Sequence, residues 1–298
     1  LNSGYSQIAI IFPLVVAMPR FLAKEITLGG LMQISSAFGR VQESLSYFVD
    51  MYASIAEWQA VVERLTGFGL HMRQVKEEDA QKELHREITA TGDIVADRLT
   101  VKLPDGGSLL ENGNFTLQPG ANVLIKGVSG SGKSTLLRVF SGIWPYVQGR
   151  LFLPSEDKIM FIPQRPYLPL GTLREALLYP GAETRTDEEL KKLMSACSIG
   201  YLSEKLPEEA DWSHVLSIGE QQRLAFVRAL IYKPLWLFLD EASSALDEET
   251  EARVYSLLAA DAPQTTLVSV GHRSTLNKYH QNVLYLDKPS RTIRWMEN

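Results

Sequence analysis

The sequence has 298 residues, of which 45% are hydrophobic, so it is long enough for one large or two ordinary domains with packed cores. Its formal net charge of -5 gives no broad basic surface for phosphate backbones, which argues against a nucleic-acid partner. The single cysteine, Cys197, excludes an internal disulfide and is expected to be a small apolar filler on a helix. Because it begins at Leu1 and has no basic leader before its first apolar run, we expect a piece of a longer polypeptide without a signal peptide.

Residues 1–70 are expected to form the end of a transmembrane domain. The apolar run at 8–18 is too short for a complete span, which needs roughly 20 apolar residues, so residues 1–18 predict a partial helix. From 27 to 68 an apolar residue recurs every third or fourth position, which predicts one long helix of about 60 Å. Polar side chains on one of its faces would suit a water-filled cavity. Taken alone, this segment is equally consistent with a long soluble amphipathic or coiled-coil helix.

Residues 71–92 are charged and lack strand-type alternation, so they predict a linker or a helix tail. From 93 to 298, short β-type runs alternate with amphipathic helical segments, which predicts an α/β domain with a mainly parallel sheet. Ligands of such sheets bind at the carboxyl ends of the strands. Strands are expected at 99–103, 122–127, 158–163, 236–240, 265–271 and 282–286, and helices at 187–198 and 220–232.

The segment 127–135 reads GVSGSGKST, follows a predicted strand and precedes an apolar helix, so it satisfies the P-loop pattern. Its glycines allow successive amide groups to point at phosphate oxygens, and the helix N-terminus adds its positive end. We expect Lys133 to reach the β- and γ-phosphates, Ser134 to bind Mg²⁺ and Thr135 to add a phosphate contact. The simpler alternative is a structural glycine turn. The predicted nucleotide-binding residues here are Gly127, Ser129, Gly130, Ser131, Gly132, Lys133, Ser134 and Thr135.

The predicted strand at 236–240 ends in two acids. Asp240, delivered to the carboxyl end of a buried strand, suits a second Mg²⁺ contact. Glu241 is one residue further on, where it could polarise the attacking water as a general base. An acidic pair after a strand is otherwise an ordinary loop start, and the P-loop expected in the same sheet favours the catalytic interpretation.

The segment 216–223 reads LSIGEQQR and opens a predicted helix. Ser217 and Glu220 have the spacing of a capping box, which is a sufficient structural explanation for both residues. A serine cap followed by Gly219 also leaves helix N-terminal amides free to face an anion. We therefore expect Ser217, Gly219 and Glu220 to contact a γ-phosphate brought by another subunit.

Together these motifs resemble the ABC ATPases in order and spacing. The set comprises the P-loop, Gln164 after a strand, the 216–223 signature, the Asp240–Glu241 strand end, the Ser-Ala-Leu-Asp segment at 244–247, and a strand followed by His272. The resemblance implies that Gln164 contacts Mg²⁺ and the water, that Asp247 couples two active sites, and that His272 contacts the γ-phosphate. Glu241, His272 and Gln164 are thus the expected catalytic residues, and Ser134, Gln164 and Asp240 the expected Mg²⁺ ligands.

Further segments narrow the resemblance to subfamily D half-transporters, and more closely to the bacterial SbmA/BacA and YddA type, which is linked to uptake of peptides or cobalamin. They are the GIWP at 142–145, the QRPY at 164–167, the VGHR at 270–273 and the residues 25–33 at the start of the long helix. The implied fold is a P-loop NTPase ABC ATPase domain with a mainly parallel sheet core, an antiparallel edge sheet and a helical signature subdomain, preceded by an α-helical transmembrane segment. Two positions depart from most ABC ATPases. Ile218 stands where glycine is usual. Leu103 stands where exporters place an aromatic residue against adenine, and because this stacking is missing we expect weak discrimination between ATP and GTP.

The resemblance implies an ATPase that uses ATP and Mg²⁺ and works as a pair, because one copy's P-loop and another's signature enclose each nucleotide. The expected partners are a second copy or a homologous half-transporter, the lipid membrane, and a transported peptide, cobalamin-like or fatty acyl molecule, without nucleic acid. The expected location is the bacterial inner membrane, with the ATPase domain in the cytoplasm. The rival class is a soluble ABC ATPase of DNA repair or translation, but the chain has neither a coiled coil between P-loop and signature nor a second ATPase domain. A catalytically dead regulator is a further alternative, which the presence of the catalytic residues disfavours.

Overall fold

The computed structural model describes residues 2–80, 83–89, 91–181 and 184–296. The chain divides into two compact units, residues 1–77 and 78–298, and each is described by itself.

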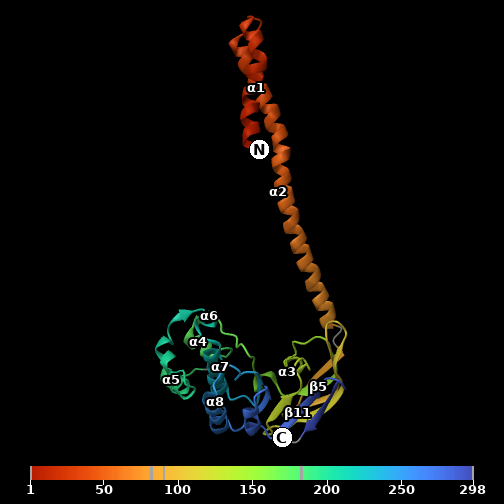
Figure 1. Ribbon diagram of the computed structural model, residues 1–298, viewed down its shortest axis with the longest axis vertical. Coiled ribbons are helices and arrows are strands. Elements are labelled where there is room, and N and C mark those ends of the chain that lie inside the picture. The colour runs from red at the N-terminus through yellow and green to blue at the C-terminus, as the bar shows by residue number, and fades with distance from the viewer. Residues whose placement is uncertain (1, 81–82, 90, 182–183, 297–298) are drawn as a thin grey trace. The chain divides into compact units, whose positions relative to one another are not determined.

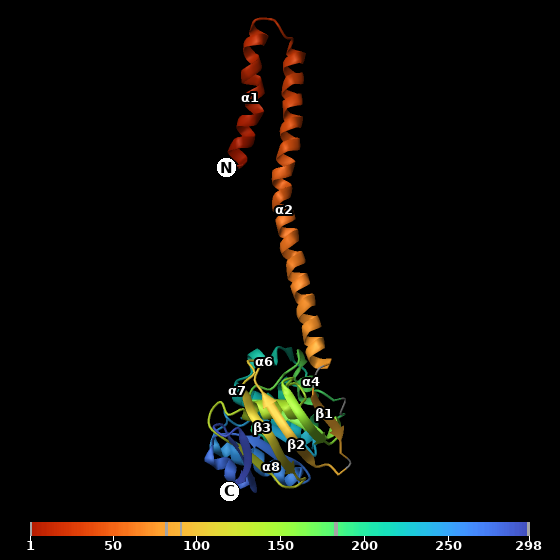
Figure 2. The same cartoon turned by 90° about the vertical axis from the view of Figure 1, so that its right-hand side faces the viewer.

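The first unit consists of two helices, α1 (Asn2–Leu22) and most of α2 (Leu28–Ala80). The two helices run side by side and are joined at one end by a short turn (Figure 2), and the rings of Phe12 and Phe38 lie 5.7 Å apart between them. Thr27 accepts a hydrogen bond from the amide of Gly30 at 3.2 Å, which helps start α2. The helix extends beyond the expected end at 68, because the following residues are rich in strong helix formers such as lysine, glutamate and alanine.

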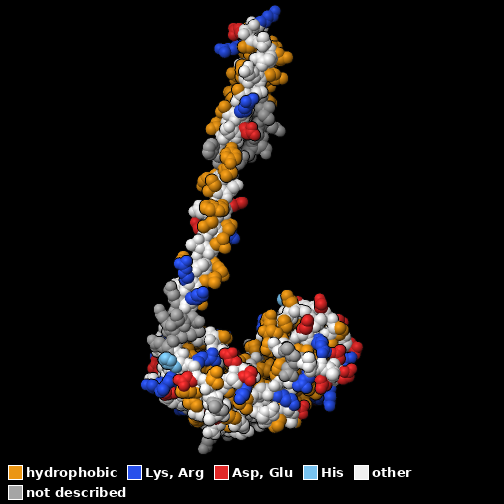
Figure 3. Space-filling model, turned by 180° about the vertical axis from the view of Figure 1, so that it is seen from behind, with side chains coloured by type: hydrophobic (Ala, Val, Ile, Leu, Met, Phe, Trp, Pro, Cys, Tyr) orange, Lys and Arg blue, Asp and Glu red, His pale blue; other side chains and the backbone are white. Residues whose placement is uncertain are grey.

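Large apolar side chains are exposed along both helices (Figure 3), among them Val15, Leu22, Leu45, Tyr52 and Trp58. Among the described residues, no helix combines the length and the mean hydropathy that crossing a bilayer requires. The assignment of residues 1–70 to a transmembrane domain is therefore not confirmed and stays a prediction.

The second unit is built on a six-stranded sheet whose strand order is β12-β11-β4-β10-β9-β6. The strands β6 (Ile159–Ile162), β9 (Trp236–Asp240), β10 (Thr266–Val270), β4 (Val123–Lys126) and β11 (Asn282–Asp287) are parallel. Only β12 (Thr292–Met296) pairs antiparallel in this sheet. The strands predicted at 122–127, 158–163, 236–240, 265–271 and 282–286 are confirmed within one residue at each end, and all five lie in this sheet. The strand predicted at 99–103 begins five residues earlier, at Ile94, and lies in the second sheet.

A second sheet has the order β1-β5-β2-β3, from β1 (Glu83–Ile88), β5 (Val147–Leu153), β2 (Ile94–Lys102) and β3 (Ser108–Leu117). It is the expected edge sheet, although only its β2 pairings are antiparallel and β1 pairs parallel with β5. The strand β1 falls where the sequence predicts a linker or a helix tail. Its hydrogen-bonding partner lies far along the chain, and such pairing leaves no local signal.

Helices gather at the opposite end of this unit from β5 (Figure 1). This group contains α4 (Leu173–Leu178), α5 (Asp187–Ala196), α6 (Trp212–Val215) and α7 (Ile218–Tyr232), with α8 (Glu248–Asp261) beside α7. A short two-stranded sheet of β7 (Gly171–Thr172) and β8 (Glu209–Ala210), and the 3-10 helices η1 (Glu156–Lys158), η2 (Gly200–Lys205) and η3 (Ser274–Tyr279), complete the unit. The helix α3 (Lys133–Phe140) follows β4 directly.

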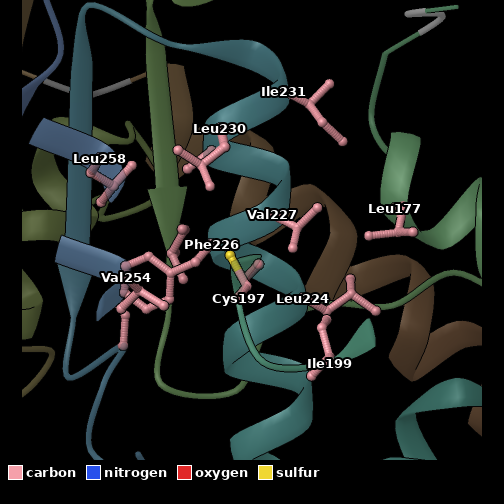
Figure 4. Packing of buried hydrophobic residues seen from close by; sticks show 14 of the residues in the cluster. Leu177, Cys197, Ile199, Leu224, Phe226, Val227, Leu230, Ile231, Val254 and Leu258 are labelled. Carbon is pink, nitrogen blue, oxygen red and sulfur yellow. The ribbon is translucent and has the colours of Figure 1, made fainter. Parts of the chain in front are cut away.

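Two apolar clusters hold the site in place. One packs around α7, where Phe226, Val227 and Leu230 meet residues of neighbouring elements (Figure 4). Cys197 belongs to this cluster, at the end of α5, and burial raises the pKa of its thiol to about 12, as expected for a filler residue. The other cluster lies between the sheets and contains Phe140 and Phe238, whose rings are 5.4 Å apart. The strand β9 is buried up to Leu239, so the sheet delivers Asp240 to the edge of a packed core.

Candidate functional site

The P-loop connects β4 to α3 at the carboxyl end of the sheet, as predicted. A Cβ on Gly127 would lie 2.6 Å from Ser131 Oγ and 2.7 Å from the carbonyl oxygen of Leu286, so only glycine fits. Gly132 caps α3 with a φ of 96°, a left-handed conformation that favours glycine. Ser129 and Gly130 lie on the exposed outer side of the loop, and Thr135 is half-buried in the first turn of α3.

Lys133 is only 7% exposed, and its ammonium spans the loop. It donates hydrogen bonds to the carbonyl oxygens of Gly127 at 3.0 Å and Val128 at 3.1 Å. Burial lowers the pKa of Lys133, an effect that the negative charges of Glu241 and Asp240 partly oppose. The ammonium therefore lies in a place where additional negative charge would be favourable.

Ser134 and Asp240 come together from α3 and the end of β9. The serine hydroxyl donates to Asp240 Oδ1 at 2.8 Å. Both residues line one end of a mostly apolar cavity of about 270 Å³, whose wall includes Phe161 and Phe238. A hydroxyl and a carboxylate oxygen are ligands that Mg²⁺ prefers.

Glu241, Gln164 and His272 form a cluster drawn from three loops. Glu241 Oε2 accepts a hydrogen bond from Gln164 Nε2 at 3.3 Å, and His272 Nε2 lies 3.6 Å from Glu241 Oε1. Glu241 has a φ of 51° and donates its amide to the carbonyl of Val270 at 2.9 Å, which fixes the backbone after β9 against β10. A non-glycine residue in this conformation carries strain, which is common at functional sites.

The signature residues form a separate group at the start of α7. Ser217 caps the helix, and its hydroxyl and amide both donate to Glu220 Oε2, at 2.6 and 2.8 Å. A Cβ on Gly219 would lie 3.1 Å from the carbonyl oxygen of Ala245, so glycine allows the helix start to approach the segment 244–247. The described hydrogen bonds of Ser217 and Glu220 stay within the signature and Tyr201, and none reaches the P-loop. Asp247 caps α8 through the amide and hydroxyl of Thr250, at 2.8 and 2.9 Å.

Comparison with known proteins places this geometry in a family. Residues 110–244 match the model of the ABC transporter family, and residues 1–73 match the SbmA/BacA-like family. An uncharacterised ABC transporter ATP-binding protein of Haemophilus influenzae is 40% identical over 286 residues, which cover 96% of this chain and 48% of that protein. The chain belongs to the ABC transporter family.

Other relatives of this ABC transporter chain agree. The inner membrane ABC transporter ATP-binding protein YddA of Escherichia coli is 32% identical over 90% of this chain and 46% of its own length. A bacterial Atm1-family ABC exporter solved with ATP bound has the same fold, with a TM-score of 0.64 and 23% identity over 90% of this chain and 49% of that one. The chain thus spans about half the length of the curated relatives it matches.

Two features of this ABC transporter site fit a bound ATP. Ser131 Oγ is buried without a hydrogen-bond partner among the described residues, and it lies beside Gly127 in the loop. A phosphate oxygen would satisfy it. The hydroxyl of Ser134 and the carboxylate of Asp240 likewise suit Mg²⁺. Leu103, the residue at the usual aromatic position, is half-buried in a turn that is closed by the amide of Gly106.

Sequence reasoning did not single out Gln222, which is fully buried in α7. Its Nε2 donates to the carbonyls of Gln164 and Glu241 and to Ser244 Oγ, at 2.9, 3.4 and 3.2 Å, and its Oε1 accepts from the amide of Ala245 at 3.0 Å. It therefore links the loop after β6 to the loop between β9 and α8. The available signal was its place in the signature, where a second glutamine on the apolar face of the helix has to find buried partners.

Arg273 and Glu251 were also missed. Arg273, next to His272, donates to the carbonyl oxygens of Leu246 and Ser244 at 2.7 and 3.0 Å. It also lies 3.7 Å from Glu251, a carboxylate that is 1% exposed and accepts a hydrogen bond from Ser243 at 2.6 Å. The hydrogen bonds of Arg273 join the His272 loop to the segment that precedes α8, and its contact with Glu251 joins it to α8 itself.

Proposed function

We propose that this chain is the ATP-binding and hydrolysing part of an ABC half-transporter that couples ATP hydrolysis to movement of a molecule across a membrane. The cluster of Glu241, Gln164 and His272 beside the Ser134–Asp240 pair carries the proposal, because it joins a candidate base to a candidate metal site at the P-loop edge. The family matches and the YddA relative support it.

The contacts described above and the family resemblance support the following roles. The P-loop amides and Lys133 bind the triphosphate, and Ser134 and Asp240 hold Mg²⁺, with Gln164 adding a contact. The metal ion, when bound, neutralises charge that develops on the phosphate oxygens. Glu241 accepts the proton of the attacking water, Gln164 keeps the carboxylate oriented, and His272 contacts the γ-phosphate.

Each active site is completed by a second copy or a homologous half-transporter, in this proposal. The described side-chain hydrogen bonds of Ser217 do not reach the P-loop, and Ser217 and Gly219 lie at the N-terminus of α7, whose positive end suits a partner's γ-phosphate. Asp247, on the adjoining loop, couples the two sites. Closure of the pair around ATP and its reopening after hydrolysis drive the transport cycle.

The transported molecule is a peptide, a cobalamin-like compound or a fatty acyl compound, in that order of preference, and the protein works in the bacterial inner membrane with its ATPase unit in the cytoplasm. The matches to the SbmA/BacA-like family and to YddA support this assignment. Stimulation of ATPase activity by each class, measured on the full-length protein in liposomes, separates the three.

Replacement of the proposed base tests the mechanism. Glu241→Gln keeps the size and polarity of the side chain but cannot accept the proton, so we expect ATP turnover to fall by about a hundredfold or more. The affinity for nucleotide should change little, and it is measured by equilibrium binding of a fluorescent ATP analogue. The matched control is Glu188→Gln on α5, outside the site. Normal turnover in the Glu241→Gln variant would show that another group is the base.

A further inference from the structure

Tyr201 lies beside the signature, on the 3-10 helix η2, and no motif includes it. Its side chain is 63% exposed, and its hydroxyl donates to Glu220 Oε1 at 2.5 Å. The other oxygen of this carboxylate, Oε2, receives the hydroxyl and the amide of Ser217. Glu220 is therefore held by three donors, and Tyr201 alone serves its second oxygen among the described contacts.

The hydroxyl of Ser217 is committed in this arrangement. A serine hydroxyl has one proton to donate, and here it goes to Glu220 at 2.6 Å, while the oxygen accepts from the amide of Glu220 at 3.4 Å. Donation to a phosphate oxygen thus requires Ser217 to release the carboxylate. The released carboxylate loses a hydrogen bond at the moment when another negative group approaches.

We propose that Tyr201 is a positioning residue of the signature, whose phenol retains Glu220 when Ser217 turns its hydroxyl toward the nucleotide of the partner. The inference rests on the proposed function and deepens it, because it identifies what the signature loses when Ser217 binds the nucleotide, namely the hydrogen bond from Ser217 to Glu220. With the phenol in place, Glu220 keeps donors on both oxygens, and its charge is held away from the phosphate. Without the phenol, release of Ser217 leaves the carboxylate with one donor.

The charges around Glu220 agree with this role. Burial acts to raise the pKa of Glu220, but the hydrogen bonds from Ser217 and Tyr201 outweigh it and the pKa is lowered, so the carboxylate stays ionised. Arg223, on the same helix, acts in the same direction. Because Glu220 is charged, its orientation relative to an approaching phosphate matters, since like charges repel.

The test compares ATP hydrolysis by the full chain and its variants over a range of ATP concentrations. Tyr201→Phe removes only the hydroxyl, and we expect KM for ATP to rise about tenfold. A tenfold change equals about 1.4 kcal/mol, which is close to the contribution of one hydrogen bond to a charged group. The kcat at saturation should fall less than about threefold, because chemistry at Glu241 is untouched. Tyr201→His supplies a donor again and should restore KM. The matched control, Tyr146→Phe, removes a tyrosine hydroxyl elsewhere in the unit.

A double-mutant cycle decides whether Tyr201 acts through the charge of Glu220. In a Glu220→Gln background, Tyr201→Phe should change KM less than about twofold, because no carboxylate remains to be retained. The inference would be overturned by an unchanged KM in Tyr201→Phe, or by the same shift in KM with and without the Glu220 charge. In either case, normal hydrolysis by the wild-type chain would leave the proposed function standing. Absence of hydrolysis by the wild-type chain would remove both.

Discussion

Burial of the charged Lys133 side chain is unfavourable for the folded chain at this site. Its ammonium is buried, and desolvation lowers its pKa, while the carbonyl oxygens of Gly127 and Val128 replace water only in part. Glu241 and Asp240 add favourable charge but lie at the end of β9, outside the P-loop. A triphosphate in the P-loop would supply the missing counter-charge, so the residue is preorganised for an anion.

His280 is the residue for which the structure predicts a pH effect on stability. It is 3% exposed, its Nδ1 lies 2.7 Å from the carbonyl oxygen of Leu276, and its Nε2 lies 2.7 Å from Ser269 Oγ. A carbonyl only accepts, so Nδ1 carries the proton, and the neutral ring accepts the serine hydroxyl at Nε2. Burial lowers the pKa of His280 below its ordinary 6.5.

The sign of this effect follows from linkage. Because the folded-state pKa is lower, the unfolded chain binds the proton first as pH falls. The contribution to the free energy of unfolding is complete above 6.5 and is lost as pH falls through the lowered value. We expect His280→Gln to flatten the dependence of the thermal unfolding midpoint on pH between about 7 and 5. His71→Gln, on α2, controls for loss of a histidine, and an unchanged dependence in His280→Gln would contradict the prediction.

At the scale of elements, motifs with a local signal could be predicted from the sequence, whereas pairings between distant segments could not. The P-loop and the Asp240–Glu241 pair each follow a strand with a strong apolar signal, so their place at the sheet edge could be predicted. The strand β1 could not, because its partner β5 lies far along the chain. Gln222 was missed for the same reason, because its hydrogen-bond partners lie on loops that only the fold brings close to it.

Gln222 connects those loops from within α7, and its removal tests whether the site acts as one element. Gln222→Ala leaves the amide of Ala245 and two loop carbonyls without this partner, which should lower the free energy of unfolding by about 1–3 kcal/mol. ATP turnover should fall about tenfold or more, because Gln164 and Glu241 lose a common anchor. Urea unfolding and steady-state ATPase measure the two effects.

The neighbouring Gln221 offers a matched control for this prediction. It is also buried in α7, but its amide donates to the carbonyls of Ser213 and Leu216. Gln221→Ala should therefore lower stability to a similar extent and reduce turnover much less. Equal losses of turnover in the two variants would mean that Gln222 matters only for packing.

The whole molecule presents two half-sites, the P-loop and the start of α7, and none of the described side-chain hydrogen bonds of Ser217 and Glu220 reaches the P-loop. The P-loop gathers the residues for a triphosphate, whereas the start of α7 presents a capped helix end with an exposed Ile218. Ile218 replaces the glycine usual in ABC ATPases, and its side chain is 39% exposed. These two surfaces become one site only when a second copy brings its signature to the P-loop, as proposed above.

Cysteine cross-linking between two copies tests this pairing. One copy carries Ser129→Cys in the P-loop, the other Ile218→Cys in the signature, and both carry Glu241→Gln to hold ATP. Both positions are exposed, and the native Cys197 is buried with a raised pKa, so it will not compete. We expect an oxidant to join the two chains when ATP is present, since a disulfide requires Cα atoms within about 7 Å. Separate chains of different mass exclude a bond within one copy. A control pair with Glu188→Cys on α5 should stay unlinked, and a bond that forms equally without ATP would refute the composite site.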